Sequence, residues 1–170
     1  CAHSNHRAAG KFAHGQLVSE LIKGGERPIA RLRFAVWRDN RDQVAESYVA
    51  WKTWGTQFES ELFDKVYSVF LDRTWARHRD AILEACTTSR SPSKRRLLFL
   101  AQIAVELAAY AGELDTSLVL LERAVDLDLF DRHWIDRCPL LEAVRATPEG
   151  QRLQQRVREA TAEIERNFRQ

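Results

Sequence analysis

The chain has 170 residues, a length typical of one domain, and 45% of them are hydrophobic and 29% charged. Its 26 Lys and Arg residues are nearly balanced by 24 Asp and Glu residues, so the charge argues against a nucleic-acid-binding surface. No apolar run approaches the roughly 18 residues of a membrane span, so we expect neither nucleic acid nor a membrane as partner.

The cysteines give no sign of a disulfide framework. Cys1, Cys86 and Cys138 are far apart in the sequence and form no Cys-x-x-Cys pair, which indicates a reducing compartment, and we expect the cytoplasm. The sequence contains no Met, which suggests that the chain is a piece of a longer protein.

The first half of the chain has apolar residues at spacings of three and four, which predicts successive helices and no strand. The first helix is expected over Ala8–Lys23, and Gly24 and Gly25 end it. The second begins at Pro28, and three further helices are expected at residues 44–54, 58–70 and 75–86. The apolar residues assigned to the second helix are Ile29, Leu32, Phe34, Val36 and Trp37.

A polar segment, TTSRSPSKRR, separates these helices from a more regular second half. Within it, Ser91 and Pro92 have the form of an N-cap and a first helical residue. The helix that follows, expected from Arg95 to Ala111, is the most apolar of the chain and should lie centrally. After GELD, Asp115 can cap the next helix, so the two form a short-looped antiparallel hairpin.

The segment DLFDRHWIDRCPLLEAVRATPEG is predicted to connect this hairpin to a last helix that starts at Thr147 and Pro148. Pro139 forces Cys138 toward an extended backbone, which favours a turn between short helices. We expect Trp134, Leu140 and Leu141 to fill the gap beneath the hairpin, with Cys138 as a small buried hydrophobic residue.

The same segment places Asp131, His133, Asp136 and Cys138 close together in sequence, which raises a catalytic alternative. In that alternative the chain is a small all-α hydrolase, dependent on a thiol or a metal, that uses His133 and Cys138. The turn at Cys138-Pro139 is not a scaffold that holds a thiol and an imidazole in line, and the spacing of possible metal ligands is irregular. We therefore expect no catalytic residue, no cofactor and no metal.

One tetratricopeptide-like repeat, a helical hairpin of about 34 residues, can be fitted to residues 98–131. Gly112 occupies its turn, and Ser117, Leu121 and Ala124 supply the small, large and small residues of its second helix. We therefore predict an all-α fold, an array of antiparallel helical hairpins (a TPR-like α-solenoid) with a C-terminal capping helix. One helical-repeat domain would cover residues 1–170, with divergent hairpins at 1–90 and the TPR-like hairpin, connector and capping helix at 91–170.

The stretch from AVELAAYAGELD to EGQRLQQRV resembles the helical-repeat C-terminal regions of large bacterial signalling proteins, particularly eukaryotic-like Ser/Thr protein kinases. The connector residues that carry the resemblance are Leu129, Phe130, Asp131, Trp134, Asp136, Cys138, Pro139, Leu140 and Leu141. The resemblance implies a structural role for this connector and places any kinase domain outside the chain.

Taken together, these patterns indicate a noncatalytic protein–protein interaction or scaffolding module. Its partner would be a protein, a peptide or a neighbouring domain of the same polypeptide, because stacked hairpins leave a concave face lined by their first helices. The residues expected to line such a partner groove are Lys94, Arg95, Gln102 and Glu106.

Overall fold

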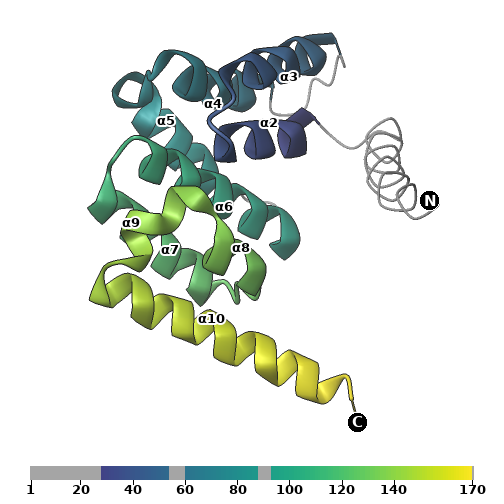
Figure 1. Ribbon diagram of the computed structural model, residues 1–170, viewed down its shortest axis with the longest axis vertical. Coiled ribbons are helices and arrows are strands. Elements are labelled where there is room, and N and C mark those ends of the chain that lie inside the picture. Colours follow the sequence, from purple (N-terminus) through teal and green to yellow (C-terminus); the bar gives the residue numbers. More distant parts are fainter. Residues whose placement is uncertain (1–27, 54–59, 88–92, 170) are drawn as a thin grey trace, which may run out of the picture. The chain divides into compact units, whose positions relative to one another are not determined.

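A computed structural model describes residues 28–53, 60–87 and 93–169, and all regular structure in these ranges is helical (Figure 1). The all-α prediction is therefore confirmed for the described residues. The helix expected over Ala8–Lys23 lies outside them. The chain divides into two compact units, residues 1–55 and 56–170, while the prediction of one helical-repeat domain stays a prediction.

The first unit contains the hairpin of α2 (Pro28–Trp37) and α3 (Arg41–Thr53). α2 ends in a left-handed turn at Asp39, with φ of 51°, and the Asn40 amide donates to the Ala35 carbonyl at 2.9 Å. The Asn40 side chain then accepts from the Gln43 amide at 3.0 Å and so caps the start of α3. One short turn thus ends one helix and begins the next.

Among the apolar residues of α2, Phe34 is not part of the core, because it is 53% exposed. Leu32 and Val36 are buried, and Phe34 lies midway between them in sequence, on the opposite side of a helix that turns about 100° per residue. Its ring instead meets the Trp37 ring edge to face at 5.4 Å between centroids.

The second unit is a succession of helices, most of which pack on a neighbour in sequence. α4 packs on α5 and α6, α5 on α6, α6 on α7, and α10 on α7, α8 and α9. Its elements are α4 (Ser60–Asp72), α5 (Trp75–Thr87), α6 (Lys94–Tyr110), α7 (Leu114–Asp126), α8 (Arg132–Arg137), the 3-10 turn η1 (Pro139–Leu141), α9 (Glu142–Arg145) and α10 (Pro148–Asn167).

The α6–α7 hairpin forms as predicted, but its capping residues differ from those expected. Ser93 caps α6, accepting from the Arg96 amide at 3.4 Å, whereas Ser91 and Pro92 lie outside the described residues. Gly112 has φ of 79° in the turn, which lets α7 begin at Leu114 and places Asp115 in its first turn instead of at the cap.

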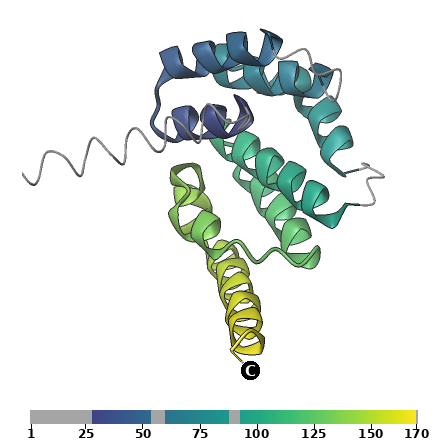
Figure 2. The same ribbon diagram turned by 90° about the vertical axis from the view of Figure 1, so that its right-hand side faces the viewer.

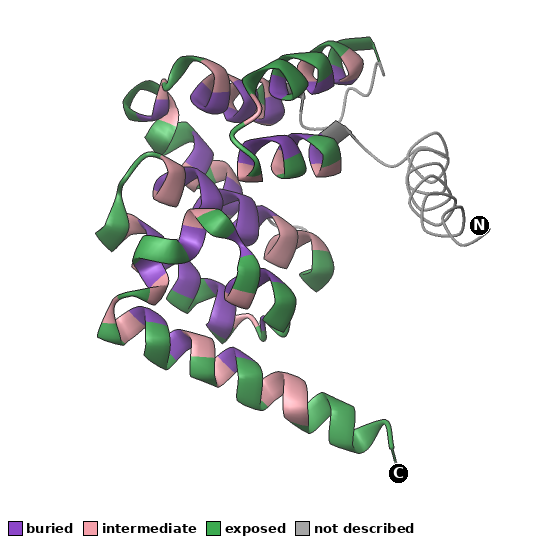
Figure 3. Ribbon diagram, in the orientation of Figure 1, coloured by how far each residue is buried: buried purple, intermediate pink, exposed green. Residues whose placement is uncertain are grey.

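α6 is the centre of the second unit. Every residue from Leu100 to Ala108 is buried, including Gln102 and Glu106 (Figure 3). A helix buried on all sides for this length must be covered on more than one face, and α5, α7 and η1 all contact it. The breadth of its apolar sequence is explained by this central position.

α10 begins where Thr147 accepts from the Gly150 amide at 2.9 Å, as expected for a Thr–Pro start. Leu153 and Val157 are fully buried, whereas Ile164 is 38% exposed. The first half of α10 therefore packs on the unit, and its last turns extend past α7 and α8, as both ribbon views show (Figures 1 and 2).

Candidate functional site

The segment between α7 and α10, which we call the connector (residues 127–147), is held by a buried hydrogen bond to α6. The Asp131 side chain caps α8 by accepting from the Trp134 amide at 3.0 Å. The Trp134 indole is 3% exposed, and its Nε1 donates to Glu106 Oε1 at 2.6 Å. Cys138 is fully buried, with Sγ 3.9 Å from the same oxygen. The buried Glu106 side chain thus accepts hydrogen bonds from Trp134 and Cys138, the two side chains that anchor the connector.

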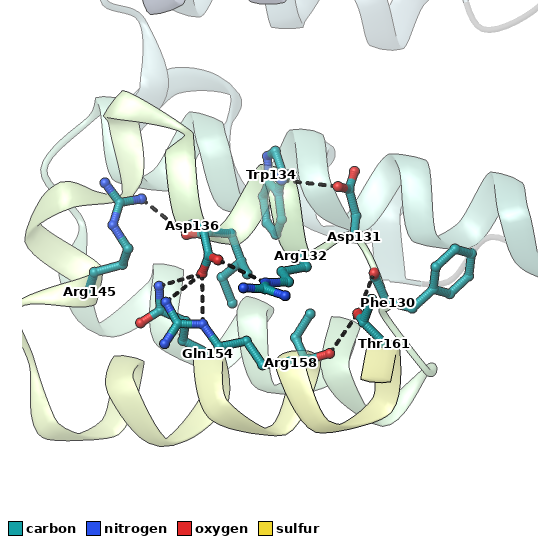
Figure 4. Close-up of polar contacts among 11 residues, drawn as sticks. Phe130, Asp131, Arg132, Trp134, Asp136, Arg145, Gln154, Arg158 and Thr161 are labelled. Carbon is teal, nitrogen blue, oxygen red and sulfur yellow. Dashed lines mark hydrogen bonds and ion pairs between the residues drawn. The ribbon is translucent and has the colours of Figure 1, made fainter. Parts of the chain in front are cut away.

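Asp136 ties the connector to α10 through a cluster of cations and amides (Figure 4). Its Oδ1 accepts from Gln154 Nε2 at 2.8 Å and from Arg158 Nη2 at 2.9 Å, and its Oδ2 lies 3.4 Å from Arg132 Nε. Burial alone would raise the pKa of the Asp136 carboxyl, but hydrogen bonds from Arg158, Gln154 and Arg132 together hold that pKa below its ordinary value.

Arg145 closes the other side of the connector. Its Nη1 donates to the Ile135 carbonyl at 3.1 Å and to the Cys138 carbonyl at 2.8 Å. These carbonyls lie at the end of α8, where a cation also interacts favourably with the helix dipole. Pro139 starts η1, and Leu141 is fully buried beneath it, while Leu140 is half-buried.

A groove of about 1100 Å³ opens beside the connector, between the start of α6, α8 and the second half of α10. Its apolar residues include Phe130, which is 55% exposed although it follows a buried Leu129. The Phe130 carbonyl accepts from Thr161 Oγ1 at 2.8 Å, which fixes this side of the groove to α10 (Figure 4). The lining residues are Lys94, Arg95, Leu98, Phe99, Gln102, Asp128, Leu129, Phe130, Asp131, Arg132, His133, Asp136, Arg137, Ala160, Thr161, Ile164 and Glu165.

Of the four residues predicted to line a partner groove, the structure brings three together and separates one. Lys94, Arg95 and Gln102 line the groove, although Gln102 is largely buried and donates to Asp131 Oδ2 at 3.2 Å. The prediction is wrong for Glu106, which is only 1% exposed and is covered by Trp134 and Cys138. It supports the connector and is not available to a partner.

The residues predicted for repeat packing lie in the α6–α7 hairpin. Ser117, Leu121 and Ala124 are all fully buried on α7, and Ser117 Oγ donates to the Glu113 carbonyl at 2.8 Å. Gly112 forms the turn that precedes them.

The structure separates the two side chains of the catalytic alternative. His133 is exposed and lines the groove, whereas Cys138 is fully buried and is not part of the groove lining. Within the described ranges no three His, Cys, Asp or Glu side chains cluster closely enough to hold a metal ion. The Cys138 thiol and the His133 imidazole therefore do not form a solvent-exposed pair.

The predicted site missed the groove's apolar rim and one of its cations. Phe130 was named only as a residue of the connector and Ile164 was given no site role, yet both are exposed and line the groove. Arg137 and Phe99 were assigned no role. In Asp128-Leu129-Phe130-Asp131 two apolar residues stand next to each other between acidic ones, and the sequence does not tell which of the two is buried.

Comparisons with known proteins add no family. No protein-family model, curated protein or solved structure matches the chain. Among the helices that the structure describes, none is both long and apolar enough to cross a membrane.

Proposed function

We propose that this chain is a noncatalytic module that binds a protein partner through the groove between α6, α8 and α10. The observation that carries the proposal is the exposed aromatic side chain of Phe130 at the rim of a large groove with Leu98, Phe99 and Ile164 in its lining. Exposed apolar side chains gathered around a concave surface and bordered by polar residues are typical of interaction sites.

The way the connector is built supports the same proposal. Glu106, Trp134 and Cys138 form a buried polar contact, and Asp136 accepts hydrogen bonds from Gln154 and Arg158 of α10, so these groups hold the groove walls in place. A binding surface on preorganised elements loses less conformational entropy when a partner binds.

The hydrolase alternative has less support. A thiol nucleophile must reach its substrate and a base, and Cys138 is buried against a carboxylate while His133 faces the groove. We therefore assign these residues to the structure of the connector and to the groove surface.

The wider role remains part of this proposal. A TPR-like arrangement and the resemblance to tails of bacterial signalling proteins, including Ser/Thr kinases, favour a scaffolding or regulatory module in the cytoplasm. Cys86 and Cys138 are buried and form no disulfide among the described residues, in keeping with a reducing compartment.

Site-specific photo-crosslinking tests the proposal. A photoreactive phenylalanine analogue is placed at Phe130 in the full-length gene product in its own cells, and at Val119 on α7 as a matched control. Val119 is 68% exposed and is not in the groove lining. We expect a discrete crosslinked protein from position 130 and none from position 119. The same product from both positions, or none from position 130, would overturn the proposal.

A further inference from the structure

We infer that a small cavity in the second unit binds a free α-amino acid in its zwitterionic form. The cavity has a volume of about 250 Å³ and lies where the junction of α4 and α5 meets the end of α6 and the residue before α7. Its polar lining comes from Arg73, Tyr110 and Glu113. The cavity shares no lining residue with the groove, so this inference goes beyond the proposed function and does not depend on it.

Arg73 supplies the positive charge of the cavity and lies on a rigid support. Its guanidinium carbon is 5.7 Å from the centroid of the Tyr110 ring. The Tyr110 hydroxyl donates to the Phe70 carbonyl at 3.2 Å, and the rings of Tyr110 and Phe70 meet edge to face at 5.0 Å between centroids. The guanidinium is thus placed before a ligand arrives, which lowers the entropic cost of binding a carboxylate.

The backbone at Arg73 is unusual for this type of residue. Arg73 directly follows α4 with φ of 55°, in the left-handed region that Gly, and less often Asn or Asp, occupies after a helix. An Arg at such a position costs free energy relative to Gly, and backbone strain of this kind is concentrated at functional sites. The strained backbone is therefore in keeping with a role for the Arg73 side chain.

Glu113 supplies the negative charge of the cavity. It precedes α7 and is exposed, and its carboxylate accepts from the neutral Thr116 hydroxyl at 3.5 Å. In the part of the chain that the structure describes, neither Arg73 nor Glu113 forms an ion pair. Two opposite charges thus line the same cavity without neutralising each other.

This pair of charges restricts the class of ligand. A simple anion would be repelled by Glu113, and a simple cation would be repelled by Arg73. An α-amino acid carries its carboxylate and its ammonium group on one carbon atom, so a single small molecule offers a partner to each. The planar guanidinium matches the carboxylate, and the Glu113 carboxylate accepts from the ammonium group.

The size and the remaining lining of the cavity restrict the side chain of the ligand. The volume is below the roughly 300–1,000 Å³ of pockets for drug-sized molecules. The remaining lining residues are the buried Val69 and Trp75 and the short side chains of Ala76 and Ala111. We therefore expect an amino acid with a small, uncharged side chain.

The test is an NMR titration of the isotope-labelled full chain with glycine, L-alanine, L-serine and L-valine. The indole N–H signal of Trp75 and the backbone amide signal of Glu113 report binding, because both residues line the cavity. Each amino acid is compared with its N-acetyl derivative, which lacks the ammonium group, and with its methyl ester, which lacks the carboxylate.

We expect saturable shifts with at least one of these amino acids and about fivefold weaker binding of both derivatives, because each derivative loses one charge-assisted contact. Arg73→Gln should remove the difference between the amino acid and its methyl ester, and Glu113→Gln the difference from the N-acetyl derivative. The matched controls Arg77→Gln and Asp115→Asn, both exposed and outside the cavity lining, should change neither difference.

Three results would contradict the inference. The first is the lack of a saturable shift with all four amino acids. The second is equal affinity for an amino acid and its two derivatives, because binding would then be independent of both charges. The third is wild-type affinity in both Arg73→Gln and Glu113→Gln, which would show an adventitious contact only. None of these results bears on the groove, which the crosslinking from position 130 tests separately.

Discussion

At the scale of single residues, Gly150 has the least room for change. A Cβ atom built on it would lie 1.9 Å from the Val144 carbonyl oxygen, so Gly150→Ala must push α10 away from α9. Ala in a helix interior is ordinarily more stable than Gly by up to about 1 kcal/mol. We expect the opposite sign here, a loss of about 1–3 kcal/mol.

Urea unfolding of Gly150→Ala beside Gln151→Ala measures this effect. Gln151 is the exposed neighbour, and its substitution should change the free energy of unfolding by less than about 0.5 kcal/mol. A Gly150→Ala variant as stable as the wild-type chain would show that α10 does not approach α9 this closely.

Trp134 is the residue on which the connector depends most. Trp134→Ala removes a buried ring and the donor to Glu106, and we expect it to cost about 3–5 kcal/mol. Cys138→Ser should cost less, about 1–3 kcal/mol at most, because its hydroxyl would lie near the Glu106 carboxylate, which can accept a hydrogen bond. Thermal melting of the two variants would contradict this account if Cys138→Ser were the more damaging.

Asp136 should make stability depend on pH. Its pKa is lowered in the folded chain, so the stabilisation is complete above the ordinary value of about 3.9 and is lost as the pH falls through the folded pKa. Because the carboxylate is partly exposed, we expect Asp136→Asn to cost only about 1–2 kcal/mol near neutral pH and much less at about pH 3.

Chemical unfolding at both pH values checks this, with Asp80→Asn on α5 as the control. Asp80 is exposed, and its substitution should have an effect of less than about 0.5 kcal/mol at either pH. A cost for Asp136→Asn that is equal at the two pH values would rule out the ionised Asp136 cluster as its source.

At the scale of the helices, several helices are followed by a residue whose backbone has the left-handed conformation, with positive φ. Gly112 follows α6 with φ of 79°, and Asp39 follows α2 with φ of 51°. Nothing lies within 4 Å of a Cβ at Gly112, so Gly112→Ala should cost about 1–2 kcal/mol through backbone strain alone. Asp39→Gly should stabilise by up to about 1 kcal/mol for the same reason. Backbone strain would not explain both effects if the melting temperatures of Gly112→Ala and Asp39→Gly changed in the same direction.

The helices are also where the sequence predicts most. Apolar spacing and the Pro, Gly and Thr positions indicated α2 to α7 and α10 to within a few residues, because each of these signals acts locally. The errors concern which face is covered. Gln102 and Glu106, four residues apart in an apolar helix, indicated a solvent-exposed face, but the connector lies over Glu106 and brings Trp134 to its carboxylate. Such coverage depends on contacts distant in sequence, which periodicity does not report.

At the scale of the whole molecule, the groove is assembled from elements that are far apart in the chain. The start of α6, the connector and the end of α10 each supply part of it. Lys94, Arg95 and Gln102 on α6 and the residues around α8 could be singled out from the sequence, whereas the end of α10 could not. Two of its acidic side chains are paired inside the unit, Asp128 with Lys94 and Asp136 with Arg132 and Arg158. The pairs of Asp128 with Lys94 and of Asp136 with Arg158 join residues that are distant in sequence, so the composition alone could not reveal them.

The measurement that tests the central claim most directly is peptide binding to Phe130→Ala, paired with its thermal melt. Phe130 is more than half exposed, so its removal should leave the melting temperature nearly unchanged. The affinity for a peptide that was selected for binding to the wild-type chain should nevertheless fall about tenfold or more. The control Val119→Ala should change neither the melting temperature nor this affinity. Wild-type affinity in Phe130→Ala would contradict the assignment of this groove as the binding surface.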